Sequence, residues 1–167
     1  MIRMVRVACG LLVVVATAAI FLSCGEGDLI SEHYRTWKEA TNAGAVSRGW
    51  LPPFLPESTT EIWETHDLDT NAGAFCFFSP TADLEALSLA LESVPSSRLK
   101  SIGPWLSVSK SWWPQTLARR RVEEFVRNDG FAIYQRRIQN PRRGEVEIWY
   151  FAINAMKGVG YGWFKEN

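Results

Sequence analysis

The chain has 167 residues, of which 18 are basic, 18 are acidic and 47% are hydrophobic. This length corresponds to one domain with enough apolar material for a buried core. The balanced charge argues against a dedicated nucleic-acid-binding protein, and the three cysteines, at positions 9, 24 and 76, argue against a disulfide framework.

The first 24 residues have the composition of an export signal. Residues 1–6 carry two arginines and no acidic side chain, residues 7–22 are almost wholly apolar, and Ser23-Cys24-Gly25 follows. The arginines favour a cytoplasmic N-terminus, with everything after the apolar run across the membrane. We therefore predict a signal peptide or membrane anchor over 1–24 and a single extracytoplasmic domain over 25–167, in a bacterial cell envelope.

Three outcomes of this segment are open. Phe21-Leu22-Ser23-Cys24 resembles the lipobox of a lipoprotein signal, in which Cys24 would be acylated. Alternatively the segment is an uncleaved single-pass anchor, although its apolar run is shorter than the about 20 residues that span a bilayer. The third outcome is ordinary cleavage near Gly25. All three export the domain, and the first two tether it.

The next segment, residues 28–48, has apolar positions at helical spacing, which predicts one or two helical segments that end at Gly49. These positions are Leu29, His33 or Tyr34, Trp37 and Ala40 or Thr41. Residues 50–56 (WLPPFLP) contain three prolines, so they predict an extended connector that lies over the core.

A β-hairpin is predicted over residues 61–79, because alternating side chains lead into turn residues and then into a second β run. Ser79-Pro80 then begins a helix with Leu84, Leu87 and Leu91 on its apolar face, and Pro95 ends it.

The rest of the chain is mainly β in character. We expect a loop with one short strand over 95–111, a short helical turn over 112–118, and strands over 131–138, 146–153 and 161–164. The strand over 146–153 is apolar on both faces, so it is covered on both sides or meets a partner. Together with the signal or anchor helix, these elements predict an α+β fold with an antiparallel sheet of about five or six strands and two or three helices.

Charge is distributed unevenly along the chain. Residues 25–94 contain 12 acidic and 3 basic side chains, a net charge of −9, whereas residues 95–167 contain 13 basic and 6 acidic ones, a net charge of +7. Two arrangements are open: the halves pack together and partly neutralise one another, or they form a bipolar surface that steers a charged partner.

The stretch IWETHDLDTN (62–71) contains the densest set of candidate catalytic groups. On a strand, Glu64 and His66 share a face while Asp67 points away, so this pair is a weak candidate for acid/base catalysis. The same pair supplies only two ligands, whereas zinc requires three or four, and a third would have to come from Asp69, Asn71 or His33. A metal site with His66 and Asp69 is therefore a weak candidate. The alternative is that Glu64 orients His66 and the turn residues shape the hairpin. We predict no metal and no cofactor.

The remaining candidates are a cysteine and three groups of arginines. Cys76, within AFCFF, is predicted to be a buried small hydrophobic residue. The arginines are 119–121, Arg136-Arg137 and Arg142-Arg143. With Trp149, the last two groups are predicted to bind a partner, which would be an envelope protein or an anionic lipid surface and not a nucleic acid.

A longer pattern carries a resemblance to known proteins. It comprises Tyr34, Ala40, Gly44-Ala45, Gly49-Trp50-Leu51-Pro52, Leu55-Pro56, Ile62 and His66-Asp67-Leu68-Asp69-Thr70-Asn71. This pattern resembles a group of small bacterial envelope proteins with an N-terminal signal or anchor and no known activity. The resemblance implies an envelope location and carries over no catalytic residue.

The sequence thus predicts a membrane-tethered extracytoplasmic domain that binds a partner or has a structural role in the envelope, rather than an enzyme. The alternative is an envelope-associated hydrolase or lytic enzyme that uses Glu64 and His66.

Overall fold

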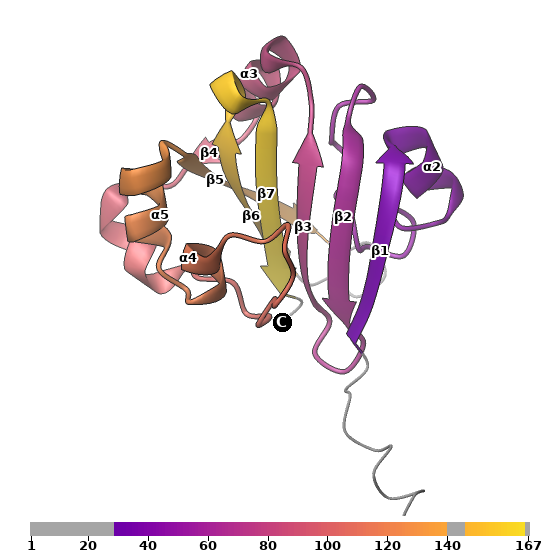
Figure 1. Cartoon of the computed structure of the whole chain (residues 1–167), viewed down its shortest axis with the longest axis horizontal. Coiled ribbons are helices and arrows are strands. Elements are labelled where there is room, and N and C mark those ends of the chain that lie inside the picture. The colour runs from indigo at the N-terminus through magenta and orange to yellow at the C-terminus, as the bar shows by residue number, and fades with distance from the viewer. Residues whose placement is uncertain (1–28, 140–145, 166–167) are drawn as a thin grey trace, which may run out of the picture.

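The computed structural model describes residues 29–139 and 146–165. Their strands form one antiparallel seven-stranded sheet in the order β1-β2-β3-β7-β6-β5-β4 (Figure 1). The strands are β1 (Leu29–Thr36), β2 (Thr60–Asp67), β3 (Ala72–Phe78), β4 (Glu92–Ser93), β5 (Ala132–Gln139), β6 (Val146–Asn154) and β7 (Val159–Lys165).

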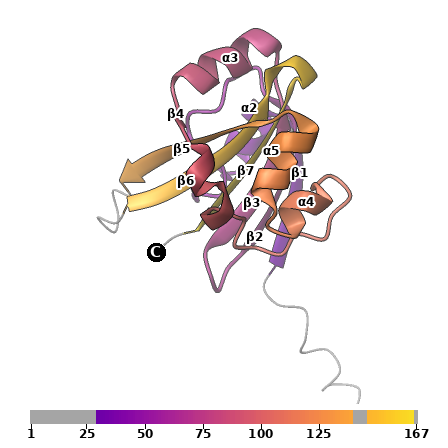
Figure 2. The ribbon, with the colours of Figure 1, turned by 90° about the vertical axis from the view of Figure 1, so that its left-hand side faces the viewer.

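Short helices complete the fold, so the prediction of an α+β architecture is confirmed. They are α2 (Trp37–Asn42), α3 (Thr81–Leu89), α4 (Gln115–Ala118) and α5 (Val122–Asp129), with 3₁₀ turns η1 (Ser96–Ser101) and η2 (Ala155–Lys157). In Figure 2, α4 and α5 lie together on one side of the sheet. No helix in the described part of the chain is both long and apolar enough to cross a bilayer.

Two hydrophobic cores lie on opposite faces of the sheet. One packs Leu117 of α4 and Phe125 of α5 against the face that carries Tyr150 and Ala152. The other packs α2, the proline-rich connector and α3 against the face that carries Trp149 and Phe151. Because β6 contributes alternate side chains to both cores, the prediction that this strand is covered on both faces is confirmed.

Three phenylalanine–glycine pairs join β3 to β7 at the centre of the sheet. The paired positions are Phe75 and Gly162, Phe77 and Gly160, and Phe164 and Gly73. In each pair the ring lies over the glycine, and a Cβ atom there would overlap the ring. A residue with a side chain therefore does not fit opposite these rings without displacing them.

The chain's two halves occupy the two halves of the sheet. Strands β1, β2 and β3 come from the N-terminal half, and β4 to β7 come from the C-terminal half. The β3–β7 pairing is therefore the junction between the two halves.

The predicted helix over residues 28–48 is wrong in its first part, which forms the edge strand β1. The helix starts only after Thr36, whose hydroxyl accepts a hydrogen bond from the Glu39 N–H at 3.2 Å. The Glu39 carboxylate in turn accepts from the Arg35 N–H at 2.8 Å, close to the reciprocal arrangement of a capping box. Pairing with β2 therefore outweighs the helical spacing of the apolar residues. That spacing is not used for burial here, since Tyr34 is the only buried residue of β1.

Three further boundaries differ from the prediction. Helix α3 ends at Leu89, before Pro95, because the chain turns to pair β4 with β5. The segment over 95–111 contains the 3₁₀ turn η1 in place of the predicted short strand. Helix α5 was not predicted, although Val122 and Phe125 are buried at helical spacing and Gly130 ends the helix with a φ of 71°. The extra strands β1 and β4 raise the strand number above that expected.

The junction between the halves can be tested by Gly162→Ala. The added methyl group must displace the Phe75 ring, so we expect the free energy of unfolding to fall by about 1–3 kcal/mol. Urea denaturation monitored by tryptophan fluorescence measures the change. In a Phe75→Leu background the same alanine should cost less, and an equal cost in both backgrounds would show that the ring is not responsible.

Candidate functional site

Glu64 and His66 lie together on β2, on the face that packs against the proline-rich connector. Their side chains are joined by a hydrogen bond of 2.8 Å between Glu64 Oε2 and His66 Nδ1. Only 1% of Glu64 and 4% of His66 is exposed. The pair is thus assembled as the strand alternation predicts, but within the core rather than in a cleft.

Trp50 covers this pair. Its ring stacks on the His66 ring with centroids 3.8 Å apart and planes 8° from parallel, and it also contacts Phe164 at 6.5 Å. Trp50 belongs to the connector, whose Leu51 and Leu55 are buried, so the prediction that this segment lies over the core is confirmed. Its predicted extended conformation is wrong, because residues 50–56 form bends and a turn. The sequence gives no signal that would pair Trp50 with His66.

Burial dominates the electrostatics of Glu64. Loss of solvent raises the pKa of its carboxyl group, while the hydrogen bond from His66 partly opposes the rise. The second oxygen, Oε1, has no hydrogen-bond partner among the described residues. The pKa of Tyr34 is raised as well, first by its own burial and then by the charge of Glu64. A neutral or proton-sharing pair is therefore favoured over a separate buried charge.

The turn after β2 is held by Asp67. Its Oδ1 accepts hydrogen bonds from the backbone N–H groups of Asp69 and Thr70, each 2.9 Å long. These backbone hydrogen bonds lower the pKa of Asp67, and the bond from Thr70 has the largest effect. Asn71 adopts a φ of 48°, which completes the turn. Asp67 is therefore the residue whose side chain holds the turn of the hairpin.

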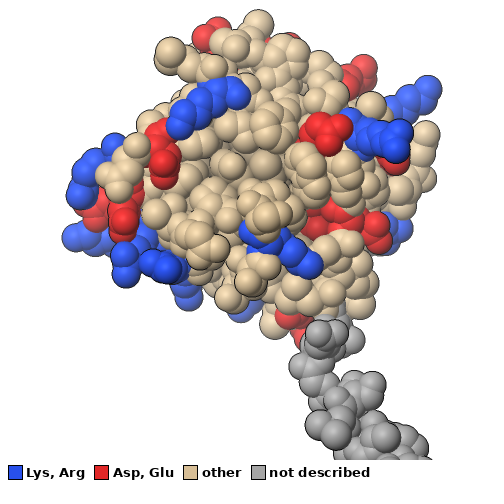
Figure 3. All heavy atoms as spheres, in the orientation of Figure 1, with Lys and Arg blue, Asp and Glu red and all other residues tan. Residues whose placement is uncertain are grey.

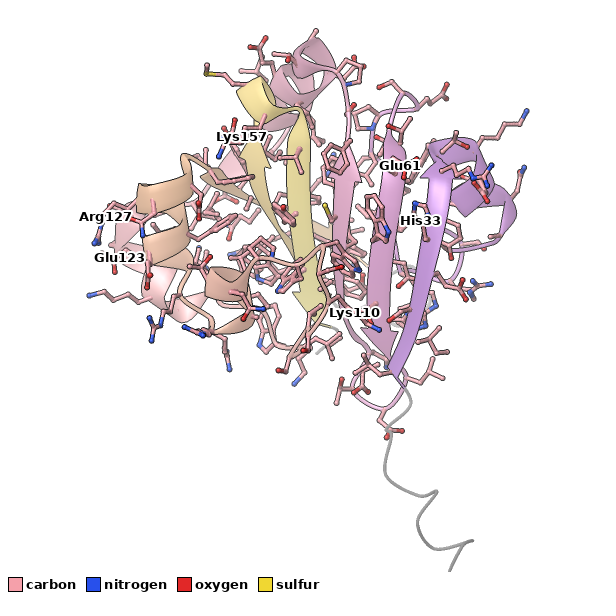
Figure 4. All side chains as sticks on the ribbon, viewed as in Figure 1. His33, Glu61, Lys110, Glu123, Arg127 and Lys157 are labelled. Atoms are coloured by element: carbon pink, nitrogen blue, oxygen red, sulfur yellow. The ribbon has the colours of Figure 1, made fainter. Side chains whose placement is uncertain are left out.

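His33 lies on the opposite face of the sheet from His66. It is on β1 rather than on a helix, and its ring stacks on Trp63 at 4.5 Å. Its Nε2 lies 3.0 Å from the Glu61 carboxylate (Figure 4). His33 therefore cannot supply a third ligand beside His66. Among the described residues, no three His, Cys, Asp or Glu side chains are grouped as a metal site would require.

The predicted partner-binding residues have different environments. The Arg136 guanidinium lies 4.2 Å from the centre of the Phe54 ring, whereas Arg137 is exposed. Trp149 was predicted to bind a partner, which requires an exposed side chain. It is only 2% exposed and stacks on Phe164 with ring centroids 4.1 Å apart, so its side chain is not available at the surface. Arg142 and Arg143, like the predicted lipidation site Cys24, lie outside the described residues.

Cys76 is buried, as predicted. It is 2% exposed, and burial raises the pKa of its thiol to about 12. A thiol with this pKa stays protonated at neutral pH and is a poor nucleophile.

The charge imbalance along the chain becomes a spatial separation in the fold. The acidic segment, residues 25–94, forms β1 to β3 with α2 at one end of the sheet, and the basic segment forms β5 to β7 with α4 and α5. The acidic segment also forms α3, which packs on η2, and β4, which pairs with β5. Every ion pair between two described residues joins partners from the same half. Figure 3 shows blue side chains gathered on the α5 side with red ones among them, and both blue and red side chains on the α2 side. The strands are therefore separated by charge without ion pairs between described residues across the β3–β7 junction, whereas Glu85 of α3 and Glu92 of β4 lie beside the basic segment.

The comparisons with known proteins give one partial match. Residues 28–78 match the family model described as the YbbD head domain. This range extends from the start of β1 to the end of β3, which is the acidic half of the sheet. It supports a relation to a bacterial envelope-type family, whereas the sequence motifs quoted above find no separate confirmation. No curated protein and no solved structure matches the chain.

The Glu64→Gln substitution tests the state of the buried pair. The amide oxygen can still accept from His66, but the carboxyl proton equilibrium is removed. Because the folded-state pKa of Glu64 is raised, the wild-type folded protein retains a proton that the unfolded chain releases above about pH 4.3. Wild-type stability therefore falls as pH rises from this value to the folded-state pKa. We expect a smaller fall in Glu64→Gln, and at least wild-type stability at pH 8.

Urea denaturation at several pH values between 4 and 8 measures this difference. Glu57→Gln, at an exposed position, is the matched control and should keep the wild-type pH dependence. An unchanged pH dependence in Glu64→Gln would contradict the assignment.

Proposed function

We propose that this protein is an extracytoplasmic domain of the bacterial envelope that is tethered to a membrane by its N-terminal segment and binds a charged partner. The observation that carries the proposal is the separation of the acidic strands β1 to β3 from the basic strands β5 to β7, without ion pairs between described residues of the two groups. Such a field attracts and orients a partner of complementary charge.

The basic side presents the groups that this binding requires. Arg119, Arg120 and Arg137 are exposed, and none of them forms an ion pair with another described residue. Arg121 and Arg127 are instead held by Glu124 and Glu123 at 3.3 Å. The unpaired guanidinium groups are suited to carboxylate or phosphate groups of an acidic envelope protein or a lipid surface.

The proposed tether follows from the N-terminal sequence, and the YbbD head domain match supports the envelope location. If Cys24 is the lipid-bearing residue, four residues separate it from β1. A chain of this length spans at most about 18 Å. The domain would therefore be held close to the membrane surface, where a partner in the same membrane is concentrated.

The hydrolase alternative has less support. A general acid or base must reach the substrate, but Glu64 and His66 are 1% and 4% exposed and Trp50 covers the ring of His66. No observation on the described residues opens a path to this pair.

The mode of tethering is tested by the intact mass of the protein extracted from the envelope. We expect a chain that begins at an acylated Cys24, and we expect Cys24→Ser to abolish acylation and retain Met1. A wild-type mass that starts at Met1 would indicate the uncleaved anchor, whereas a mass that starts near Gly25 without lipid would contradict the tether.

Partner binding is tested by charge reversal on the two sides of the sheet. We expect Arg119→Glu combined with Arg137→Glu to reduce recovery of the partner from detergent-solubilised envelopes at least tenfold. Added salt should weaken wild-type recovery, because it screens exposed charges. Quantitative mass spectrometry of the co-purified proteins and lipids measures both effects.

The matched control is Arg35→Glu combined with Lys38→Glu, which makes the same change of charge at exposed positions on the acidic side. It should leave recovery unchanged. Equal losses in the two double variants, or recovery that does not depend on salt, would contradict binding through the basic side.

A further inference from the structure

A small cleft opens between the segment before α4, helix α5 and the start of β7. Its volume is about 310 Å³, at the lower end of the range of about 300–1,000 Å³ for small-molecule sites. Five of its lining residues are aromatic: Trp112, Trp113, Phe125, Phe131 and Tyr161. These residues are distant in sequence and are brought together by the fold.

The Trp113 ring stands at right angles to two of the other rings. Trp113 lies edge-on to Trp112 at 5.7 Å and 85°, and to Tyr161 at 5.8 Å and 88°. Trp113 and Phe125 are each 2% exposed, whereas Trp112 and Tyr161 are half-buried. The two half-buried rings therefore offer apolar surface to a ligand, and the buried rings hold them in position.

Polar groups of both charges stand at the rim. The Lys157 ammonium donates to the backbone carbonyl of Asp129 at 2.9 Å and lies 5.5 Å from the centre of the Phe131 ring. The Asp129 carboxylate forms no ion pair with another described residue. The Ser111 hydroxyl adds a neutral donor and acceptor. Figure 4 labels Lys157 near the start of β7, toward the α5 side.

This combination restricts the chemistry of a ligand. Aromatic rings attract cationic ligands, but here the ammonium of Lys157 over Phe131 would repel such a ligand. The carboxylate of Asp129 would repel an anionic ligand. The phenol of Tyr161 adds no charge. Burial, followed by the electrostatic effect of Cys76, raises its pKa to about 12. A neutral ligand that combines an apolar face with several hydroxyl groups matches both the aromatic rings and the polar side chains of this lining.

We propose that this cleft is a saccharide-binding site that accepts one pyranose unit of a neutral glycan. The C–H face of the ring would pack on Trp112 and Tyr161, and its hydroxyl groups would bond to Asp129, Lys157 and Ser111. Displacement of water from the aromatic surface and paired hydrogen bonds at the rim provide the affinity. The site goes beyond the charged surface proposed above and does not depend on it, because neither Arg119 nor Arg137 lines the cleft.

The test uses the full chain in a polyoxyethylene detergent, which carries neither a sugar nor a quaternary ammonium group. Cellotriose, maltotriose and N,N′,N″-triacetylchitotriose are the probes, with saturation-transfer NMR and tryptophan fluorescence as readouts. We expect at least one trisaccharide to bind saturably. Trp112→Ala should weaken that binding at least tenfold, and Asp129→Asn should weaken it several-fold.

Met156→Ala is the control, because Met156 is 95% exposed and lies outside the cleft; it should bind as the wild type does. Urea denaturation of Trp112→Ala verifies that the variant is folded. Tighter binding of tetramethylammonium than of any trisaccharide, no saturable binding of the three sugars, or wild-type sugar affinity in folded Trp112→Ala would each overturn the proposal. The charge-reversal variants Arg119→Glu and Arg137→Glu should retain sugar binding, which separates this test from that of the proposed function.

Discussion

The interlock of phenylalanine rings and glycines between β3 and β7 is the constraint on which the rest of the structure depends. Phe75, Phe77 and Phe164 each occupy the space above a glycine of the neighbouring strand. The rings are large enough to bury substantial area, and the missing side chains let them lie flat across the sheet. Because this seam joins the N-terminal and C-terminal halves of the chain, it aligns two otherwise separate sets of strands in one sheet.

That alignment determines which side chains share a row. His66, Gly73, Phe164 and Trp149 are successive partners across β2, β3, β7 and β6. The Phe164 ring over Gly73 can therefore contact both Trp50 and Trp149, and the row becomes a buried aromatic layer above the sheet. This layer explains why His66 is covered and why Trp149 is not a surface residue. The same strand order places the acidic strands β1 to β3 at one end of the sheet and the basic strands β5 to β7 toward the other.

The two binding surfaces proposed for this protein differ in physical character. The basic side acts through long-range charge, which is screened by salt and favours rapid association with a partner concentrated at the membrane. The aromatic cleft acts at contact distance through apolar area and neutral hydrogen bonds, which salt affects little. A domain with both features can be held near a charged partner while it contacts a glycan. The cleft is built by the C-terminal half, which lies outside the matched YbbD head domain range.

Local patterns in the sequence were enough to predict several elements of this fold. Alternation and turn residues predicted the β2–β3 hairpin, the two-sided strand β6 and the pairing of Glu64 with His66, because each depends on neighbours in the chain. Only tertiary structure decided that residues 29–36 pair as an edge strand, since their spacing fits a helix as well. Helix α5 did have local signals in Val122, Phe125 and Gly130. Contacts between residues distant in the chain have no such local signal. Trp50 on His66 and the aromatic side chains around the cleft form only when each half folds, and Phe75 lies over Gly162 only once the two halves are joined.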